Sequence, residues 1–297
     1  MPIPITVIVL TKNEETRIAA CLETVKWADE VLVVDSFSTD ATLDIASAAG
    51  ARVLQHPFTN FAAQHNYAQS QALHDWVFFV DADERVSDEL RDEIQQRCVN
   101  GALAQNTAYH IQRVHLFSGR WFPDPKTRKV TLRLLAQIKQ REVPRLINRA
   151  VATWERPLHE EVRAPEPHGI LHGVIYHYST TNLSATLEKF NHYTNLEAAY
   201  LHQTGRSATV LSALWRGFRA FAFQYIIWGM FRYGQHGLML SLLIGMNKFM
   251  NYAKLWERQR IRDNQGIWIE QDRALLTRYN LESHDDDHSV VSGDHTP

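Results

Sequence analysis

The sequence predicts an α/β fold in which a mainly parallel sheet is flanked by helices and followed by a helical C-terminal region. The first hundred residues alternate short β-branched runs with helical stretches, which is typical of βα units that build a parallel sheet. Residues 182–262 have a helical pattern and many aromatic side chains. Hydrophobic residues make up 45% of the 297 residues and charged residues 22%, so the composition is that of a folded globular chain.

Four apolar runs are the expected strands of the sheet. They are residues 4–11, 30–35, 52–55 and 76–80. Helices are expected between them: one that follows an N-cap at Asn13, one over residues 40–49 that ends at Gly50, and one over residues 61–73. Right-handed crossovers then place the carboxyl ends of all four strands at one edge, where ligands of open α/β sheets bind.

Changes of pattern divide the chain into four expected segments: residues 1–108, 109–180, 181–262 and 263–297. The second contains short apolar runs among Arg, His and Pro, which favours mixed strands and loops. The chain from Leu281 onward has five acidic residues, no Lys or Arg and little apolar content, so this end is expected to be disordered.

Composition and motifs exclude several classes of protein. A net charge of −2 provides no electrostatic footprint for nucleic acid over the whole chain. Cys21 and Cys98 lie far apart and match no metal-binding spacing, which favours a reducing cytosolic compartment. The N-terminus lacks a basic leader, and no apolar run approaches the ~20 residues of a spanning helix. The fingerprints GxGxxG and GxxxxGK[ST] are absent from the sequence.

The acidic run Asp81-Ala82-Asp83-Glu84 directly follows an apolar strand. Side chains two apart in an extended segment point the same way, so Asp81 and Asp83 are expected to converge on one ligand. A divalent cation that also binds a diphosphate would neutralise them, because Mg²⁺ prefers one or two carboxylates plus phosphate oxygens and water. A purely structural alternative makes Ser87 the cap of the next helix, with acidic residues in its first turn. That alternative leaves both aspartates unexplained.

Asp35 ends the second strand and opens the segment DSFSTDAT. If the first strand lies between the second and the fourth, Asp35 and Asp81 are about 10 Å apart along the edge, which a nucleotide can bridge. Asp35 is then expected to bind a base or ribose, with Thr11 and Asn13 beside it. The alternative is that Asp35 satisfies a turn while a residue after it caps a helix.

Several segments together resemble glycosyltransferase family two, which has the GT-A fold. They are TVIVLTKNEE, VLVVDSFSTDAT, FAAQHNYA and WVFFVDADE, in this order and spacing. Downstream, RPLHEEV, HGVIYHYSTTNLSATLEKFNHYT and YGQHGLMLSLLIGMNKFMNYAKLWE resemble the lipopolysaccharide-core glucosyltransferase branch. The resemblance covers most of residues 3–257. It implies inverting transfer of a sugar from a nucleotide diphosphate, with a DxD motif that holds Mg²⁺ or Mn²⁺.

The resemblance also assigns roles to individual positions. Asp35 corresponds to the base contact, Asp81 to the ribose or metal contact, and Asp83 to the metal ligand. Residues 1–108 become the nucleotide-sugar-binding half and residues 109–180 the acceptor-binding half. The nucleotide-sugar site is expected to contain Thr11, Asn13, Glu14, Asp35, Gln64, Asn66, Asp81 and Lys189.

Inversion requires a base that removes the proton of the acceptor hydroxyl on the face opposite the leaving group. The resemblance points to the His-Glu pair in RPLHEEV, so Glu160 is the expected base, with His159 beside it and Glu161 as the substitute. The alternative for three polar residues in a surface turn is simple solvation.

Three further residues have an expected or open role. His177 is expected to reach the diphosphate or complete the metal site with Asp83, although a lone His on an apolar strand can equally be a hydrogen-bonded core residue. Lys189 offers positive charge to phosphate, whereas most helix-surface lysines are only solvated. Arg133 resembles an arginine that precedes the acceptor loop in the family, without a defined role.

The helical region is basic as well as aromatic. Residues 207–262 contain one acidic residue, Glu257, and eight basic residues: Arg216, Arg219, Arg232, Lys248, Lys254, Arg258, Arg260 and Arg262. Basic residues that flank apolar, aromatic-rich helices predict an element that lies on an anionic membrane surface. A helical subdomain or a dimer contact is the alternative. We therefore expect a cytoplasmic protein that associates peripherally with the inner membrane.

The sequence thus favours a glycosyltransferase that moves a hexose, with UDP-glucose as the expected donor, to a lipopolysaccharide-core or related glycolipid. A sugar-phosphate nucleotidyltransferase is the competing enzyme, but the segment TKNEE stands where a Gly-rich basic loop is typical of that class. A glycoside hydrolase fits the nucleotide-like first half less well. An inactive membrane-bound scaffold that binds nucleotide without turnover is the alternative outside enzymes. The sequence does not determine the oligomeric state.

Overall fold

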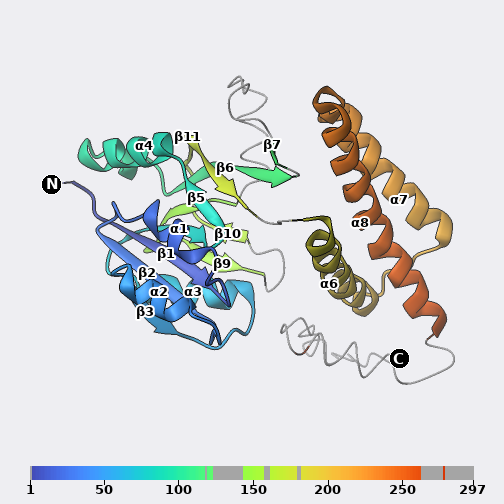
Figure 1. Cartoon of the computed structure of the whole chain (residues 1–297), viewed down its shortest axis with the longest axis horizontal. Helices are drawn as coiled ribbons and strands as arrows, with labels where there is room; N and C mark the ends of the chain where they lie inside the picture. The colour runs from blue at the N-terminus through green and yellow to red at the C-terminus, as the bar shows by residue number, and fades with distance from the viewer. Residues whose placement is uncertain are drawn as a thin grey trace, which may run out of the picture. The chain divides into compact units, whose positions relative to one another are not determined.

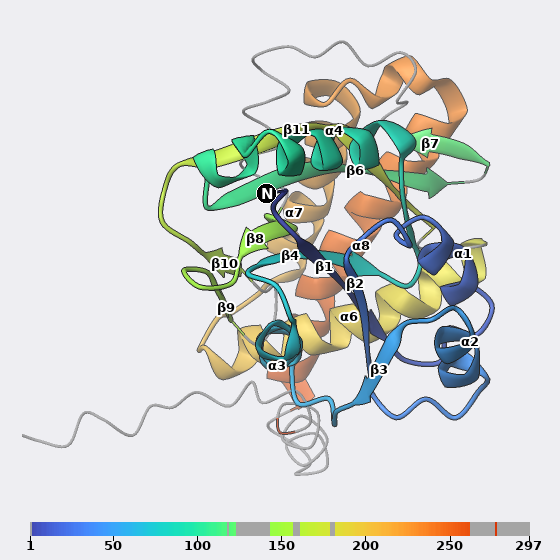
Figure 2. The same cartoon turned by 90° about the vertical axis from the view of Figure 1, so that its left-hand side faces the viewer.

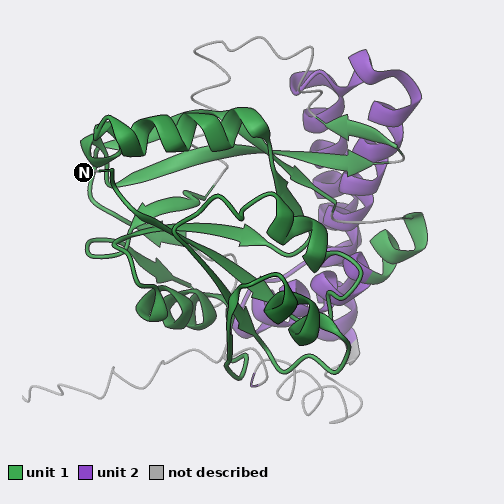
Figure 3. Cartoon of the chain, turned by 60° about the vertical axis from the view of Figure 1, so that its left-hand side comes forward, with its two compact units in different colours: residues 1–188 green, residues 189–297 purple. Residues whose placement is uncertain are grey.

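The structure, a computed structural model, describes residues 2–117, 119–122, 143–156, 161–178, 182–261 and 277. The chain divides into two compact units, Met1–Glu188 and Lys189–Pro297 (Figure 3). The expected tail, residues 263–297, lies outside the described residues except for Thr277.

Four parallel strands form the first half of the sheet in the order β3-β2-β1-β4; Figure 1 labels the first three of them and Figure 2 labels all four. They are β1 (Ile5–Thr11), β2 (Glu30–Asp35), β3 (Arg52–Gln55) and β4 (Trp76–Asp81). The sequence prediction is confirmed for all four, with a difference of one residue at the start of β1 and at the end of β4. The apolar side chains of β1, β2 and β4 are mostly buried because helices cover both faces, as parallel sheets require, whereas those of the edge strand β3 are partly buried.

The second half of the sheet is mixed in direction. The strands are β5 (Glu84–Val86), β6 (Ala108–Phe117), β7 (Arg120–Phe122), β8 (Leu146–Asn148) and β11 (His168–His177). Strand β8 runs antiparallel between β4 and β6, and β11 is parallel to β6. A separate hairpin pairs β9 (Thr153–Glu155) with β10 (Glu161–Arg163). The expectation of a mainly parallel sheet therefore holds for the first half, and the expectation of mixed strands holds for the second.

Helices cover both faces of the sheet (Figure 2). They are α1 (Ile18–Glu23), α2 (Thr42–Ala48), α3 (Phe61–Gln71), α4 (Asp88–Val99) and the 3₁₀ turn η1 (Ala102–Gln105). Because successive strand side chains point to opposite faces, Val7 packs in the core that contains α1 and α4, while Ile8 packs in the core that contains α3. Residues from both predicted halves, 1–108 and 109–180, contribute to these cores.

The helix boundaries confirm two of the sequence predictions and correct one. Gly50 adopts φ +80 after α2, and the Ser87 hydroxyl accepts a hydrogen bond from the Leu90 amide at the start of α4. The predicted N-cap at Asn13 is wrong. Helix α1 begins after Arg17 without a side-chain cap, and Asn13 instead accepts a hydrogen bond from the Thr39 amide (2.8 Å).

The C-terminal region is helical, as predicted for residues 182–262 over its described part. It contains α6 (Leu183–Gln203), α7 (Val210–Ala222), the π-turn η2 (Phe223–Ile227), the 3₁₀ turn η3 (Met230–Tyr233) and α8 (Gly234–Ile261). Helices α7 and α8 approach closely at Gly217 and Gly245, where an added Cβ would lie 2.8 and 2.9 Å from the Cβ atoms of Phe249 and Phe221. None of the helices that the structure describes has the length and hydrophobicity to cross a membrane.

Candidate functional site

The carboxyl ends of β1, β2 and β4 place three predicted site residues along one edge of the sheet. Thr11 is in register with Asp35, and Leu10 is in register with Asp81. The predicted strand order is therefore confirmed, since β1 separates the two aspartates. Thr11 is buried, and its hydroxyl is among the described buried side-chain atoms that have no hydrogen-bond partner.

Asp35 organises the loop that follows β2. Its side chain is fully buried, and its carboxylate accepts hydrogen bonds from the Ser38 amide (2.8 Å), the Ser38 hydroxyl and the Gln55 amide nitrogen (3.2 Å). These contacts correspond to the turn-forming alternative from the sequence. A direct contact between Asp35 and a nucleotide stays a prediction.

The loops after β1 and β2 are joined at this edge. The Asn13 amide donates to the Ser38 hydroxyl (2.7 Å), and the Glu14 amide donates to the Thr42 hydroxyl (2.8 Å). Asn13 (φ 54) and Phe37 (φ 60) both adopt left-handed backbone, which is uncommon for residues other than glycine and concentrates at functional sites.

The two predicted residues of α3 lie in different surroundings. The Gln64 amide nitrogen donates to the Ser36 hydroxyl (3.1 Å), and its oxygen lies 2.9 Å from His56 Nδ1, so Gln64 adjoins the loop after β2. Asn66 instead donates to the Trp154 carbonyl (2.8 Å) and accepts from the Trp154 amide (2.9 Å). The amide of Asn66 thus fixes β9 onto α3, and its nucleotide role stays a prediction.

Asp81 forms an ion pair that the sequence did not indicate. Its carboxylate oxygens lie 3.1 and 3.4 Å from the two terminal nitrogens of Arg145, which is a bidentate arrangement. Burial opposes ionisation of Asp81, yet the Arg145 guanidinium outweighs it and holds the pKa of that carboxyl well below its usual range. The chain turns at residues 82 and 83, so the extended geometry expected for the DxD segment is wrong.

Glu84, the last residue of the acidic run, is fully buried beneath Asp81. One oxygen accepts a hydrogen bond from the Asp81 amide (3.0 Å), and the other lies 3.6 Å from Arg145 and 3.7 Å from Arg113. Burial raises the pKa of Glu84 although both arginines oppose the rise. Two guanidinium groups from distant segments therefore balance part of the negative charge of the DADE run.

Asp83 contacts the other predicted metal ligand. Its carboxylate lies 3.3 Å from His177 Nε2, and His177 Nδ1 lies 3.0 Å from His115 Nδ1 on the neighbouring strand. Burial raises the pKa of Glu14, and the nearby charge of Asp83 adds to this rise against the effect of Arg17. The structure thus brings together Asp83 and His177, the two residues that the sequence expects to share a metal site, and a common role for them stays a prediction.

A divalent cation shared with a diphosphate fits these residues better than a cation enclosed by the protein. Among the residues that the structure describes, no group of three or more His, Cys, Asp or Glu side chains is arranged to hold a metal ion. Asp83 and His177 offer one carboxylate and one imidazole. Mg²⁺ commonly takes one or two carboxylates from the protein and completes its octahedron with phosphate oxygens and water, and Mn²⁺ also accepts imidazole nitrogen.

The remaining predicted residues are placed as follows. His159, Glu160 and Arg133 lie outside the described residues. Glu161 begins β10 and forms an ion pair with Arg156 (2.7 Å) at the surface. Lys189 is exposed on α6, at the start of the second unit.

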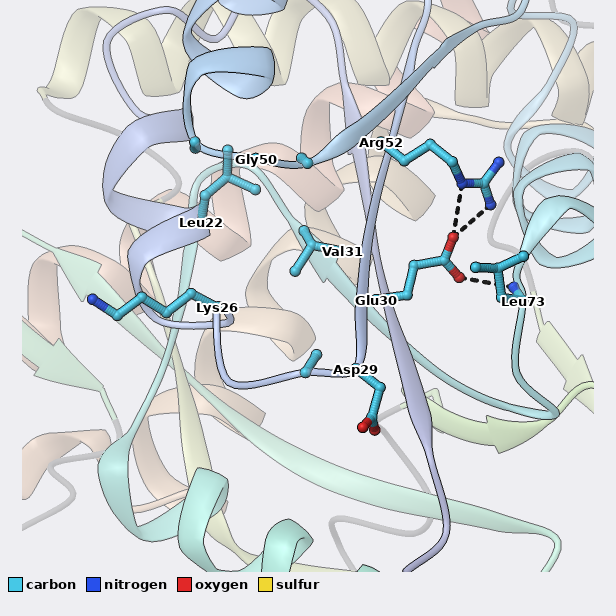
Figure 4. A pocket seen from close by; sticks show the side chains of 11 residues that line it. Leu22, Lys26, Asp29, Glu30, Val31, Gly50, Arg52 and Leu73 are labelled. Atoms are coloured by element: carbon cyan, nitrogen blue, oxygen red, sulfur yellow. Dashed lines mark hydrogen bonds and ion pairs between the residues drawn. The ribbon is translucent and has the colours of Figure 1, made fainter.

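A pocket of about 330 Å³ lies at the opposite, amino-terminal ends of β2 and β3 (Figure 4). Its buried acid, Glu30, forms an ion pair with Arg52 (2.6 Å). The Glu30 carboxylate also accepts hydrogen bonds from the Thr6 hydroxyl and the Leu73 backbone amide. Asp29 accepts a hydrogen bond from the Ile5 amide (2.8 Å). These acids hold strand ends together, and they lie away from the carboxyl edge.

The sequence model of Glycosyl transferase family 2 matches residues 6–155, about half of the chain. The chain belongs to glycosyl transferase family 2. An uncharacterized glycosyltransferase of Rickettsia typhi is 31% identical over 85% of this chain and 87% of its own length.

Two further proteins resemble this glycosyltransferase over most of its length. The lipopolysaccharide core biosynthesis glycosyltransferase LpsC of Rhizobium meliloti is 23% identical over 89% of this chain and 96% of its own. S. aureus TarS 1–349, a solved structure, is 18% identical with a TM-score of 0.46, over 94% of this chain and 90% of that one. The fold itself is the GT-A-like arrangement that the sequence predicted, with a parallel half, a mixed half and C-terminal helices.

Arg145, Arg113, Glu84 and His115 are the site residues that sequence reasoning missed. Glu84 carried a signal, since it extends the acidic run after a buried strand. The others carried none, because only the pairing of β6, β8 and β11 brings them to the end of β4.

Proposed function

We propose that this glycosyltransferase moves a hexose, with UDP-glucose as the first donor to test, onto a lipopolysaccharide-core or related glycolipid acceptor with inversion. Membership of family 2 supports sugar transfer, and the resemblance to LpsC, a lipopolysaccharide core biosynthesis glycosyltransferase, supports the acceptor class. The observation that carries the proposal is the contact of Asp83 with His177 (3.3 Å), next to Asp81 at the carboxyl edge of the parallel strands.

In this proposal Asp83 and His177 hold Mg²⁺ or Mn²⁺, with Asp81 beside them. The cation stabilises negative charge on the departing diphosphate when it is bound. Thr11, Asn13, Glu14, Asp35 and Gln64 shape the nucleotide end of the site, because their loops are joined at the same edge. Asn66 and Lys189 are further candidates for contacts with the donor.

Glu160 is the proposed base, assisted by His159. An ionised carboxylate can accept the proton of the acceptor hydroxyl while the new glycosidic bond forms, so a single in-line displacement completes the reaction. This assignment comes from the family resemblance of the segment RPLHEEV. Glu161 is the alternative candidate for the base.

The mechanism is tested with three variants and two measurements. Glu160→Gln should lose turnover but retain affinity for UDP and Mn²⁺ in calorimetry. Asp83→Asn should lose Mn²⁺ affinity as well as turnover. Glu155→Gln, which removes an exposed ion pair with Arg163, serves as the control. Turnover by Glu160→Gln at the wild-type rate rules out Glu160 as the base, and wild-type activity in the presence of chelators rules out the metal.

The same assay separates the competing functions. Donor nucleotide sugars are screened for thermal stabilisation in the presence of Mn²⁺, because a bound ligand stabilises the fold by mass action. Release of UDP with transfer to a glycolipid supports the proposal. Formation of a nucleotide sugar from a sugar phosphate with release of pyrophosphate supports a nucleotidyltransferase, and binding without either reaction supports a scaffold.

We also propose that the second unit associates with the anionic cytoplasmic face of the inner membrane. Large apolar side chains are exposed at intervals along α7, η2, η3 and α8: Val210, Leu211, Leu214, Trp215, Phe218, Phe223, Ile226, Ile227, Phe231, Leu238, Met239, Leu242 and Met246. Arg219 and Arg232 are exposed on the same segment. An apolar stripe of this extent with neighbouring basic side chains suits insertion to the depth of the headgroups.

Liposome flotation tests this association. The double variant Leu211→Ser/Trp215→Ser should float less than wild type on vesicles that contain anionic lipid, and so should a chain truncated after Gly205. Leu73→Ser removes an equally exposed leucine from the first unit and should float like wild type. Equal recovery of all four proteins contradicts the proposal.

A further inference from the structure

Two histidines face each other across β6 and β11 at the end nearest Asp83. His115 and His177 are in register on these parallel strands, and their Nδ1 atoms lie 3.0 Å apart. The rings meet edge to face, with centroids 4.9 Å apart. The other ring nitrogen of His177, Nε2, lies 3.3 Å from Asp83. His177 therefore sits between a carboxylate and a second imidazole.

The hydrogen bond between the two rings depends on which nitrogen of each imidazole carries the proton. Two Nδ1 atoms at hydrogen-bond distance require one N–H and one lone pair. While His177 Nε2–H faces the Asp83 carboxylate, neutral His177 presents a lone pair at Nδ1, and His115 Nδ1–H donates to it. If Nε2 is to offer its lone pair to a cation instead, each ring moves its single proton to its other nitrogen. The hydrogen bond is then kept with its direction reversed, and no proton is gained or lost.

We propose that His115 is a positioning residue for the metal site, which acts by holding the ring of His177 through this hydrogen bond in both states. The inference rests on the proposed function, because it assumes that Asp83 and His177 hold the cation. Hydrogen-bond partners of metal-bound histidines fix ring orientation and tautomer, and removing one commonly costs 10–100-fold in metal affinity.

A second histidine pair on the same two strands provides a matched control. His110 Nε2 lies 3.3 Å from His168 Nδ1, with ring centroids 5.5 Å apart, near the start of β11. His110→Phe and His115→Phe remove equivalent imidazoles from one strand, but only the second removal breaks the contact with His177. A loss of Mn²⁺ affinity caused by general disturbance of β6 would appear in both variants.

The test measures Mn²⁺ affinity by calorimetry on the full chain in the presence of UDP, and the dependence of transfer on Mn²⁺. We expect His115→Phe to weaken Mn²⁺ binding by about 10-fold or more, and to raise the Mn²⁺ concentration for half-maximal rate with a smaller change in kcat. His110→Phe should stay within about twofold of wild type. His115→Asn should recover most of the affinity, because its amide takes the place of Nδ1, whereas His115→Gln should not.

The outcomes separate this inference from the proposed function. Unchanged Mn²⁺ affinity in His115→Phe overturns the inference while leaving the metal site intact. If His115→Phe does not fold, the comparison of the Asn and Gln variants decides, and equal affinities of these two overturn the inference. Failure of the wild-type protein to bind Mn²⁺ with UDP refutes the metal site itself, and the inference with it.

Discussion

Replacement of Arg145 by Met should destabilise the first unit more than the removal of an exposed ion pair would. Arg145 is about 10% exposed and faces both Asp81 (3.1 Å) and the fully buried Glu84 (3.6 Å). Removing one partner of a buried pair costs about 3–5 kcal/mol because the other charge stays buried. The Asp81 side chain is 38% exposed and solvent screens that part of the interaction, so we expect a loss of about 2–3 kcal/mol at neutral pH.

The loss should depend on pH in a defined direction. Arg145 holds the pKa of Asp81 below its usual range, so the pair stabilises the fold above the unfolded-state pKa of about 3.9, and this stabilisation falls as pH drops below that value. In Arg145→Met that contribution is already absent. The difference in stability between the variant and wild type should therefore be largest near neutral pH and should narrow below about pH 3.

Thermal unfolding followed by tryptophan fluorescence measures both effects. A loss of about 2–3 kcal/mol corresponds to a Tm lower by about 4–12 °C for a unit of this size. Arg163→Met is the control, because Arg163 and Glu155 form an exposed pair (3.3 Å) that contributes about 1 kcal/mol or less. Equal Tm values for the two variants, or a difference from wild type that does not narrow toward acid pH, would refute this reasoning.

Three other substitutions or treatments test the packing of the first unit. Gly173→Ala should lower the free energy of unfolding by about 1–3 kcal/mol in a urea titration, because the added Cβ would lie 2.3 Å from the Leu90 backbone; an unchanged midpoint contradicts this packing. Ser87→Ala should cost about 0.5–2 kcal/mol in the same titration through loss of the α4 cap, and an equally stable variant shows that the cap is dispensable. The thiols of Cys21 and Cys98 should resist a thiol reagent near pH 8 until the protein unfolds, because burial raises the pKa of Cys98 to about 11 and that of Cys21 further; rapid labelling of the native chain argues against this burial.

The strands of the first half could be predicted because parallel strands buried on both faces are continuous apolar runs. The runs that end at Asp35 and before Asp81 carry this pattern, and their crossovers fix the edge at which the site lies. The cap at Asn13 could not be predicted correctly, since its side chain bonds to a loop that follows a different strand. Asn13 is a residue type that favours N-caps, but its side-chain oxygen instead accepts a hydrogen bond from the backbone amide of Thr39, 26 residues away.

The contacts of the acidic run, residues 81–84, could not be predicted from the sequence. Extended geometry predicts that the side chains of Asp81 and Asp83 point the same way, whereas the chain turns at residues 82 and 83, and Glu84 is the fully buried acid of the run. Arg145 is 64 residues from Asp81 in sequence and reaches it only because its segment lies between β4 and β6. No pattern in the sequence near Asp81 indicates an arginine that reaches it from another part of the sheet.

The two aspartates of the DxD segment consequently differ in what they can offer a ligand. Asp81 already faces a guanidinium that matches both of its oxygens, so a cation that bound it would compete with a permanent positive charge. Asp83 faces His177, a neutral imidazole. When the His177 proton shifts from Nε2 to Nδ1, the hydrogen bond to Asp83 is lost without any change in the charge of His177. In the proposed mechanism, this difference favours Asp83 and His177 over Asp81 as the protein ligands of the cation. Asp81 and Arg145 stay paired beside them, and the buried Glu84 is a second carboxylate partner of Arg145 that also accepts a hydrogen bond from the Asp81 backbone amide.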